Sequence, residues 1–240
     1  MLSKKKAPLY YLSVVSIFMI TLTSCLKSGT TSTTTTPPIT YLSIIDMALQ
    51  APPLETYFNA TKVSAAIAPG SWSQVYSAVQ PGSYAVVFKK ATADSVVASI
   101  PTASYDSAKY YSFIIYNDQP NSAKAFTAYD DFTGITYDKP YVRFLHLSQD
   151  AGQVDFYLGA TKLFNSRQLA DNQNVTIYNN FTGTPPGTYT LQAKVAGTDS
   201  VIASNSFSFM AGNAYTIFLG GLKNGTGSNA LSINVLMASK

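Results

Sequence analysis

His146, Ser148 and Asp150 are the residues of this chain whose types could form a nucleophilic catalytic site. Residues i and i+2 of a β-strand share a face, so a contact between His146 and Ser148 is compatible with the local sequence. The segment contains no strained Gly-x-Ser-x-Gly turn to expose a nucleophile, and the whole chain has one histidine. We therefore predict no catalytic residues and no enzymatic activity, and interpret His146 as a hydrogen-bonded histidine at the end of a strand.

The acidic residues form no recognisable metal-binding pattern. Among the 12 Asp and Glu residues, one pair is adjacent, Asp130-Asp131, and neighbours in a strand point to opposite faces. The sequence has no Asp-x-Asp-x-Asp-Gly calcium loop, and one cysteine cannot form a cysteine-clustered zinc or iron–sulfur site. The sequence predicts neither a metal nor a cofactor.

The single cysteine, Cys25, follows a segment with the features of a secretion signal. Three lysines at positions 4–6 precede an apolar run at 9–21, which is shorter than the about 20 residues that a membrane-spanning helix needs. The tetrapeptide Leu22-Thr23-Ser24-Cys25 resembles the bacterial lipobox. We predict that residues 1–24 are a lipoprotein signal peptide and that Cys25 carries the lipid. The alternative is an ordinary secreted protein with a buried thiol.

The residues after Cys25 predict a flexible tether and exclude a nucleic-acid-binding charge pattern. Three of the 16 basic residues lie in the leader, which leaves 13 against 12 acidic ones, so no nucleic-acid partner is expected. Residues 25–38 are rich in Thr and end in Pro37-Pro38, a composition with little to bury. This segment resembles the linkers of bacteroidete-type lipoproteins. We expect outer-membrane attachment, with the periplasmic and the surface-exposed face both left open.

The rest of the chain contains one unit twice. Residues 54–62 match residues 154–162 at an offset of 100, and residues 81–99 match residues 186–204 at an offset of 105 with ten of nineteen positions identical. The five added residues of the second copy fall between Lys162 and Pro186, near Phe181. A period of about 100 residues indicates a domain duplication, and we predict separate domains at 39–133 and 139–240. About 95 residues are enough to bury a core, so we expect residues 138–240 to fold alone.

Each copy has the pattern of an all-β domain. Short runs rich in aromatic and β-branched residues alternate with turn residues about every ten positions, and no helical spacing persists outside the leader. This pattern predicts two tandem immunoglobulin-like β-sandwiches, each of about 95 residues. Tyr84 and Tyr189 follow a Pro-Gly pair, a position typical of a tyrosine corner, in which the hydroxyl bonds to the backbone.

The second copy resembles a known family. Residues 141–151, YVRFLHLSQDA, followed by Val154-Asp155, are similar to the opening stretch of the domain of unknown function 4397 family. The resemblance is close over residues 140–221 and weaker over 39–118, where Asp46, Ala48 and Gln50 occupy the positions of His146, Ser148 and Asp150. It implies an envelope or secreted β-sandwich module of no agreed activity.

A difference between the copies predicts a binding patch. In the strand at 110–116, Tyr110, Ile114 and Tyr116 alternate with apolar residues that both copies share, whereas the second copy has Ala214, Phe218 and Gly220 there. Alternation places these three side chains on the opposite face from the shared core. We expect an exposed patch for a glycan or a protein. The alternative is that these residues pack against the sister repeat or in cross-strand pairs.

Two classes of function follow from these features. The first is a non-catalytic, lipid-anchored envelope protein that presents a binding face to a glycan or an envelope protein, with the membrane as its other partner through Cys25. The second is an accessory domain or hydrolase of envelope polysaccharide or peptide metabolism. A deep polar pocket with convergent acids would favour the second class, and the sequence offers no carboxylate pair or triad to build one.

Overall fold

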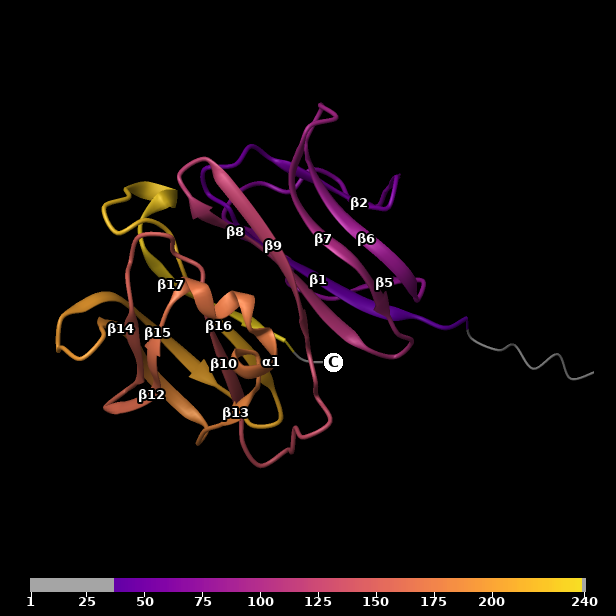
Figure 1. Cartoon of the computed structure of the whole chain (residues 1–240). Coiled ribbons are helices and arrows are strands. Elements are labelled where there is room, and N and C mark those ends of the chain that lie inside the picture. The colour runs from indigo at the N-terminus through magenta and orange to yellow at the C-terminus, as the bar shows by residue number, and fades with distance from the viewer. Residues whose placement is uncertain (1–36, 239–240) are drawn as a thin grey trace, which may run out of the picture. The chain divides into compact units, whose positions relative to one another are not determined.

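The computed structural model describes residues 37–238, and these residues are mostly β-strand (Figure 1). They form four sheets, with one short α-helix and two 3-10 turns. The predicted all-β sandwich fold is confirmed. The predicted leader, Cys25 and most of the predicted tether lie outside the described residues. No helix in the described part of the chain is long and apolar enough to cross a membrane.

The first repeat forms two sheets. Its strands are β1 (Thr40–Met47), β2 (Leu54–Phe58), β3 (Thr61–Lys62), β4 (Ser71–Trp72), β5 (Ser77–Val79), β6 (Gly82–Lys90), β7 (Val96–Tyr105), β8 (Tyr110–Gln119) and β9 (Ser122–Tyr129). One sheet has the order β4-β1-β8-β9, with β5 also paired to β1, and the other has the order β3-β2-β6-β7. Strand β9 is therefore one edge of the first sheet, and strand β7 is one edge of the second.

The second repeat has the same plan with one substituted segment. Its elements are β10 (Tyr141–His146), β11 (Val154–Leu158), β12 (Thr161–Arg167), η1 (Leu169–Gln173), α1 (Val175–Tyr178), β13 (Thr182–Gly183), β14 (Gly187–Val195), β15 (Val201–Phe209), β16 (Ala214–Gly220), η2 (Gly227–Asn229) and β17 (Ser232–Met237). The sheet orders are β13-β10-β16-β17 and β12-β11-β14-β15. The 3-10 turn η1 and the helix α1 lie where the first repeat has β4, in the region of the predicted insertion, whereas β13 is the counterpart of β5, because it pairs with β10 as β5 pairs with β1.

Each repeat contains one parallel strand pair. Strand β1 pairs with β8 and β10 pairs with β16, in the same register: Tyr41 lies opposite Tyr110, and Tyr141 opposite Ala214. The sheets of a typical immunoglobulin domain are antiparallel, so this pairing departs from the simple form of that expectation. The pairing is parallel because the chain leaves β1 for the other sheet and returns to enter β8 from the end at which β1 began.

A separate apolar core lies between the two sheets of each repeat. The first core includes Phe88 and Phe113, and the second includes Phe144 and Phe156, whose rings stack with centroids 4.6 Å apart. Strand alternation directs these side chains inward because every second residue faces the same layer. The predicted shared core face is thus present in both copies.

The predicted tyrosine corners are also present. The hydroxyl of Tyr84 donates to the carbonyl oxygen of Gln80 at 3.1 Å, and that of Tyr189 donates to the carbonyl oxygen of Pro185 at 3.0 Å. Both bonds span four residues of backbone at the start of an equivalent strand, β6 or β14. These tyrosines therefore fix a turn in each repeat.

A third apolar core joins the repeats. It contains residues of β1, β8 and β9 together with residues of β10, β16 and β17. All strands of the first repeat lie within the predicted 39–133 and all those of the second within 139–240, yet residues 38–240 form one compact unit. The ability of either predicted domain to fold alone remains a prediction.

Candidate functional site

The residues predicted to form an exposed patch lie at the contact between the repeats. Ile114 is fully buried and Tyr116 is 4% exposed, both in the third core with Leu145 and Phe218 of the second repeat. Tyr110 is half-buried and stacks on Tyr41, with ring centroids 4.5 Å apart. The structure therefore does not present Ile114 or Tyr116 to an external partner, because the outer face of this sheet is covered by the equivalent sheet of the sister repeat.

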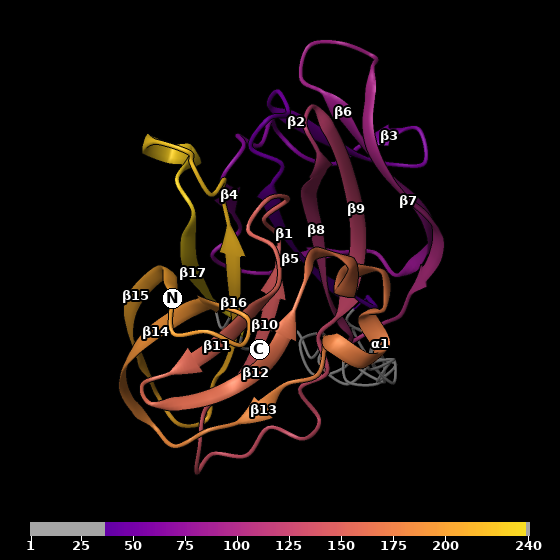
Figure 2. The ribbon, with the colours of Figure 1, turned by 60° about the vertical axis from the view of Figure 1, so that its left-hand side comes forward.

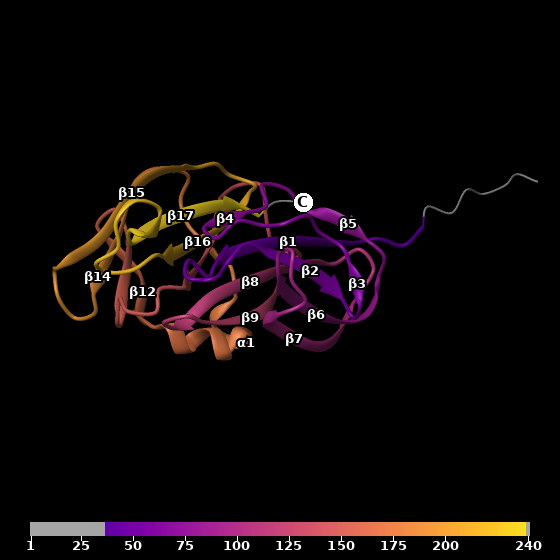
Figure 3. The ribbon, with the colours of Figure 1, turned by 90° about the horizontal axis from the view of Figure 1, so that it is seen from above.

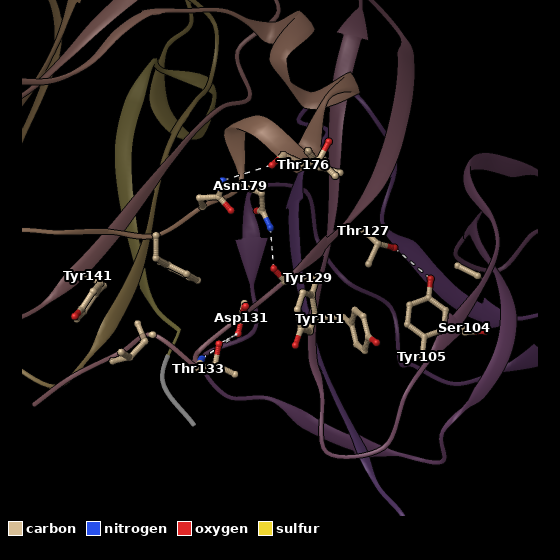
Figure 4. Close-up of a pocket in the computed structure, with 16 residues that line it drawn as sticks. Ser104, Tyr105, Tyr111, Thr127, Tyr129, Asp131, Thr133, Tyr141, Thr176 and Asn179 are labelled. Carbon is tan, nitrogen blue, oxygen red and sulfur yellow. Dashed lines mark hydrogen bonds between the residues drawn. The ribbon is translucent and has the colours of Figure 1, made fainter.

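A cleft of about 530 Å³ opens beside this contact (Figure 4). One wall consists of residues from β7, β8 and β9, and the other of the linker after β9 and the segment from α1 to Phe181. Figure 2 and Figure 3 both show α1 beside β7 and β9. The volume lies within the usual range of about 300–1,000 Å³ for small-molecule sites.

Tyrosine rings form the strand wall of the cleft. Tyr105 and Tyr111 are buried and pack edge to face at 5.1 Å, and Tyr129 lies 5.5 Å from Tyr111 with 38% of its surface exposed. Burial raises the pKa of Tyr105, whose hydroxyl lies 3.2 Å from that of Thr127. The wall thus offers one accessible ring, Tyr129, on a rigid aromatic base.

The opposite wall combines polar side chains with apolar and aromatic ones, such as Tyr141 and Phe181, and one hydrogen bond fixes it to the first repeat. The side-chain amide of Asn179 donates to the carbonyl oxygen of Tyr129 at 2.8 Å and accepts from Arg143 at 2.7 Å. Asp131 accepts from the backbone N–H of Thr133 at 3.0 Å and from its hydroxyl at 2.7 Å. Asp131 is the one charged side chain among the described residues that line the cleft. The cleft is therefore aromatic and polar but nearly uncharged.

The residues considered for catalysis lie apart from this cleft. His146 is buried, and its Nε2 lies 2.8 Å from the carbonyl oxygen of Gly152. The hydroxyl of Ser148 donates to Asp150 at 3.2 Å, and Asp150 also accepts from the backbone N–H of Lys223 at 2.9 Å. The structure brings Ser148 and Asp150 together in a turn, whereas His146 faces the interior of the second repeat. Within residues 37–238, no three His, Cys, Asp or Glu side chains gather in a group able to hold a metal ion.

His146 and its counterpart Asp46 are both buried, with opposite effects on stability. Burial lowers the pKa of His146 to about 4 and raises the pKa of Asp46 to about 7. The neutral forms are the ones that the interior favours. His146 therefore makes the protein less stable as the pH falls from 6.5 toward 4, and Asp46 makes it less stable as the pH rises from 4 toward 7.

We predict that replacing either residue exposes the effect of the other. Relative to the wild type, Asp46→Asn should gain stability as the pH rises from 4 to 7, and His146→Gln should gain stability as the pH falls from 6.5 to 4. Each slope is at most about 1.4 kcal/mol per pH unit for one proton. Urea denaturation at four pH values measures both slopes, and parallel curves for the two variants would contradict the prediction.

The sequence interpretation missed the cleft because its walls come from segments far apart in the chain. Tyr105, Tyr129 and Asn179 meet through the packing of one repeat on the other, which strand periodicity does not encode. One signal pointed to the region: the second copy carries extra residues near Phe181, and insertions in repeats often lie on a binding face. Phe181 lines the cleft.

Comparison with known families gives one match. A family model described as a domain of unknown function, DUF4397, matches residues 40–157. This range covers the first repeat and continues through β10 into β11, so it includes the run at 141–151 that carried the resemblance. The model matches once, so it does not itself identify a tandem repeat. No curated protein matches this chain.

Proposed function

We propose that this chain is a non-catalytic, lipid-anchored protein of the cell envelope that binds an uncharged glycan in the cleft between its repeats. The observation that carries the proposal is the combination of an accessible ring, Tyr129, with hydroxyl and amide groups in a nearly uncharged cleft. Aromatic rings stack on the apolar faces of sugars, and hydroxyls and amides bond to sugar hydroxyls. A charged ligand would find one carboxylate in the lining, Asp131, already bonded to Thr133, and the ammonium group of Lys109 5.6 Å from the centroid of the Tyr129 ring.

The position of the cleft supports an extended ligand. It lies between residues of β7, β8 and β9 and the segment that contains Asn179 and Asn180, so its walls come from both repeats. The aromatic base of Tyr105 and Tyr111 is buried and well packed, so the site is preformed rather than assembled on binding. A preformed site suits a ligand whose affinity comes from several weak contacts along a chain.

We predict that Tyr129→Ala weakens glycan binding by roughly ten-fold or more, because stacking on this ring is lost. Titration calorimetry with neutral oligosaccharides released from envelope polysaccharide measures the change. Tyr137→Ala is the matched control, since Tyr137 is 92% exposed and does not line the cleft. Equal affinities for the wild type and Tyr129→Ala, or binding of peptides but of no oligosaccharide, would overturn the proposal.

Anchoring rests on the lipobox-like tetrapeptide that ends at Cys25. Buried acyl methylenes contribute about 0.8 kcal/mol each, so two or three chains give stable attachment. We predict that Cys25→Ala moves the protein from the membrane fraction to the soluble fraction and abolishes its labelling by palmitate. Retention of wild-type membrane association and labelling in this variant would refute the lipid anchor.

A further inference from the structure

The two repeats meet through equivalent faces of equivalent sheets. Their strand ladders align residue for residue: Ser43 lies beside Ser112 as Arg143 lies beside Thr216, and Ser112 lies opposite Ala128 as Thr216 lies opposite Leu236. The buried residues of the third core, between the repeats, come from these matched positions. They are Ile45, Met47, Ile114, Tyr116 and Ala128 of the first repeat and Leu145, Leu147, Phe218 and Leu236 of the second. Such a contact has the form of a dimer interface that uses one patch twice.

The interface contains one buried ion pair that departs from its symmetry. Nη1 of Arg143 lies 2.6 Å from Oδ1 of Asp130, and both side chains are fully buried. The residue equivalent to Arg143 is Ser43. The residue equivalent to Asp130 is Ala238, because each donates its N–H to the first residue of the neighbouring strand, at 2.8 Å in both cases. The ion pair therefore joins unlike repeats and has no counterpart across the interface.

The polar groups around the pair hold each charge on its own repeat. Oδ2 of Asp130 accepts from the hydroxyls of Tyr76 and Ser112, each at 2.6 Å. Nε of Arg143 donates to the hydroxyl of Thr216 at 2.8 Å, and Nη1 donates to Asn179 at 2.7 Å. These partners are hydroxyls and an amide, which can donate or accept. These hydroxyls and the amide could therefore surround a charge of either sign. The preference for one repeat over the other as partner comes from the charges of Asp130 and Arg143.

Pairing of like repeats would leave these ions unpaired. Two first repeats would bury two Asp130 carboxylates without a cation, and two second repeats would bury two Arg143 guanidinium groups without an anion. Size adds to this preference. A Cβ at Gly220 would lie 2.2 Å from the Cε of Met47, so the end of the Met47 side chain fills the space beside Gly220, where a like repeat would place the much larger Tyr116.

We propose that the ion pair between Arg143 and Asp130 makes a first repeat pair with a second repeat, and prevents either repeat from pairing with another of its own kind. The face then pairs within one chain, or between two chains only as a reciprocal exchange of repeats. The linker at 131–140 could span about 35 Å when extended, so such an exchange is physically accessible. This inference concerns the assembly of the repeats and is independent of the proposed glycan site.

Charge reversal in the chain from residue 38 onward tests the selection. Asp130→Arg places two cations at the interface and Arg143→Asp places two carboxylates there, so each variant alone should remain monomeric and melt about 10 °C lower. The double variant Asp130→Arg/Arg143→Asp should be a monomer that recovers most of the loss. An equimolar mixture of the two single variants, refolded together, should form a one-to-one heterodimer with two ion pairs, detectable by native mass spectrometry.

The exposed pair of Glu55 and Lys62, 2.6 Å apart, gives the matched control: a mixture of Glu55→Lys and Lys62→Glu should stay monomeric. A reversal mixture that yields only monomers, or as much homodimer as heterodimer, would overturn the proposal. A double variant no more stable than the single variants would also overturn it.

Discussion

Asp130→Ala is expected to lower the free energy of unfolding by about 3–5 kcal/mol. The substitution leaves the guanidinium of Arg143 buried without its carboxylate, and it removes the acceptor of the Tyr76 and Ser112 hydroxyls. Removing one partner of a buried ion pair costs more than the pair itself contributes, because the remaining charge stays desolvated. Urea denaturation of the chain from residue 38 onward measures the loss.

A double variant shows whether the loss of stability comes from the charge left unpaired or from lost packing. Asp130→Ala/Arg143→Ser places at both sites the residues that the sister repeat has at the equivalent positions, so no orphan charge remains. It should lose less stability than the sum of the two single variants. Additive losses would contradict coupling between the two side chains. Asp94→Ala, at an exposed ion pair with Lys89, should have a much smaller effect than Asp130→Ala.

Phe218→Ala is expected to lower the free energy of unfolding by about 3–5 kcal/mol, the usual cost of deleting a buried phenylalanine side chain. Phe218 is fully buried in the core between the repeats, and its ring packs edge to face with Trp72 of the first repeat, with ring centroids 5.2 Å apart. The cavity would therefore weaken both repeats, although the substitution lies in the second. Denaturation gives the overall loss, and hydrogen exchange of β8 reports the effect on the first repeat.

Phe156→Ala is the matched control for this prediction, because Phe156 is equally buried but belongs to the second repeat's own core. It should destabilise β11 and its neighbours while leaving a smaller effect on β8. If Phe218→Ala left the protection of β8 unchanged, the two repeats would not be coupled through this core.

The core between the repeats also bears on the prediction that residues 138–240 fold alone, since isolation would expose Leu145, Leu147 and Phe218 to water.

The sandwich architecture could be predicted because its determinants are local and repeated. Phe113 and Ile115 face the core of the first repeat, and their counterparts Ile217 and Leu219 face the core of the second. The Pro-Gly-x-Tyr segments place Tyr84 and Tyr189 at equivalent corners. The short strands β4 and β5 could not be predicted in this way. Both short strands pair with β1, and a two-residue strand carries too little pattern to be recognised.

The packing of one repeat on the other could not be predicted in the same way. Alternation assigns Ile114 and Tyr116 to a face, but it does not determine whether water, a partner or the sister repeat covers that face. Gly220 in place of Tyr116 was a sign of this contact, because Met47 fills the space that a side chain would need. Arg143 was a further sign: a charged residue between Val142 and Phe144 requires a buried partner.

Hydrogen exchange with and without a bound neutral oligosaccharide tests the proposed glycan site most directly. Binding in the cleft should slow exchange at the end of β9 around Tyr129 and in the segment from 175 to 181. It should leave β2 and β14, which contribute no residue to the lining of the cleft, unchanged. Protection confined to strands outside the cleft, or binding with no change at Tyr129 and its neighbours, would contradict the account.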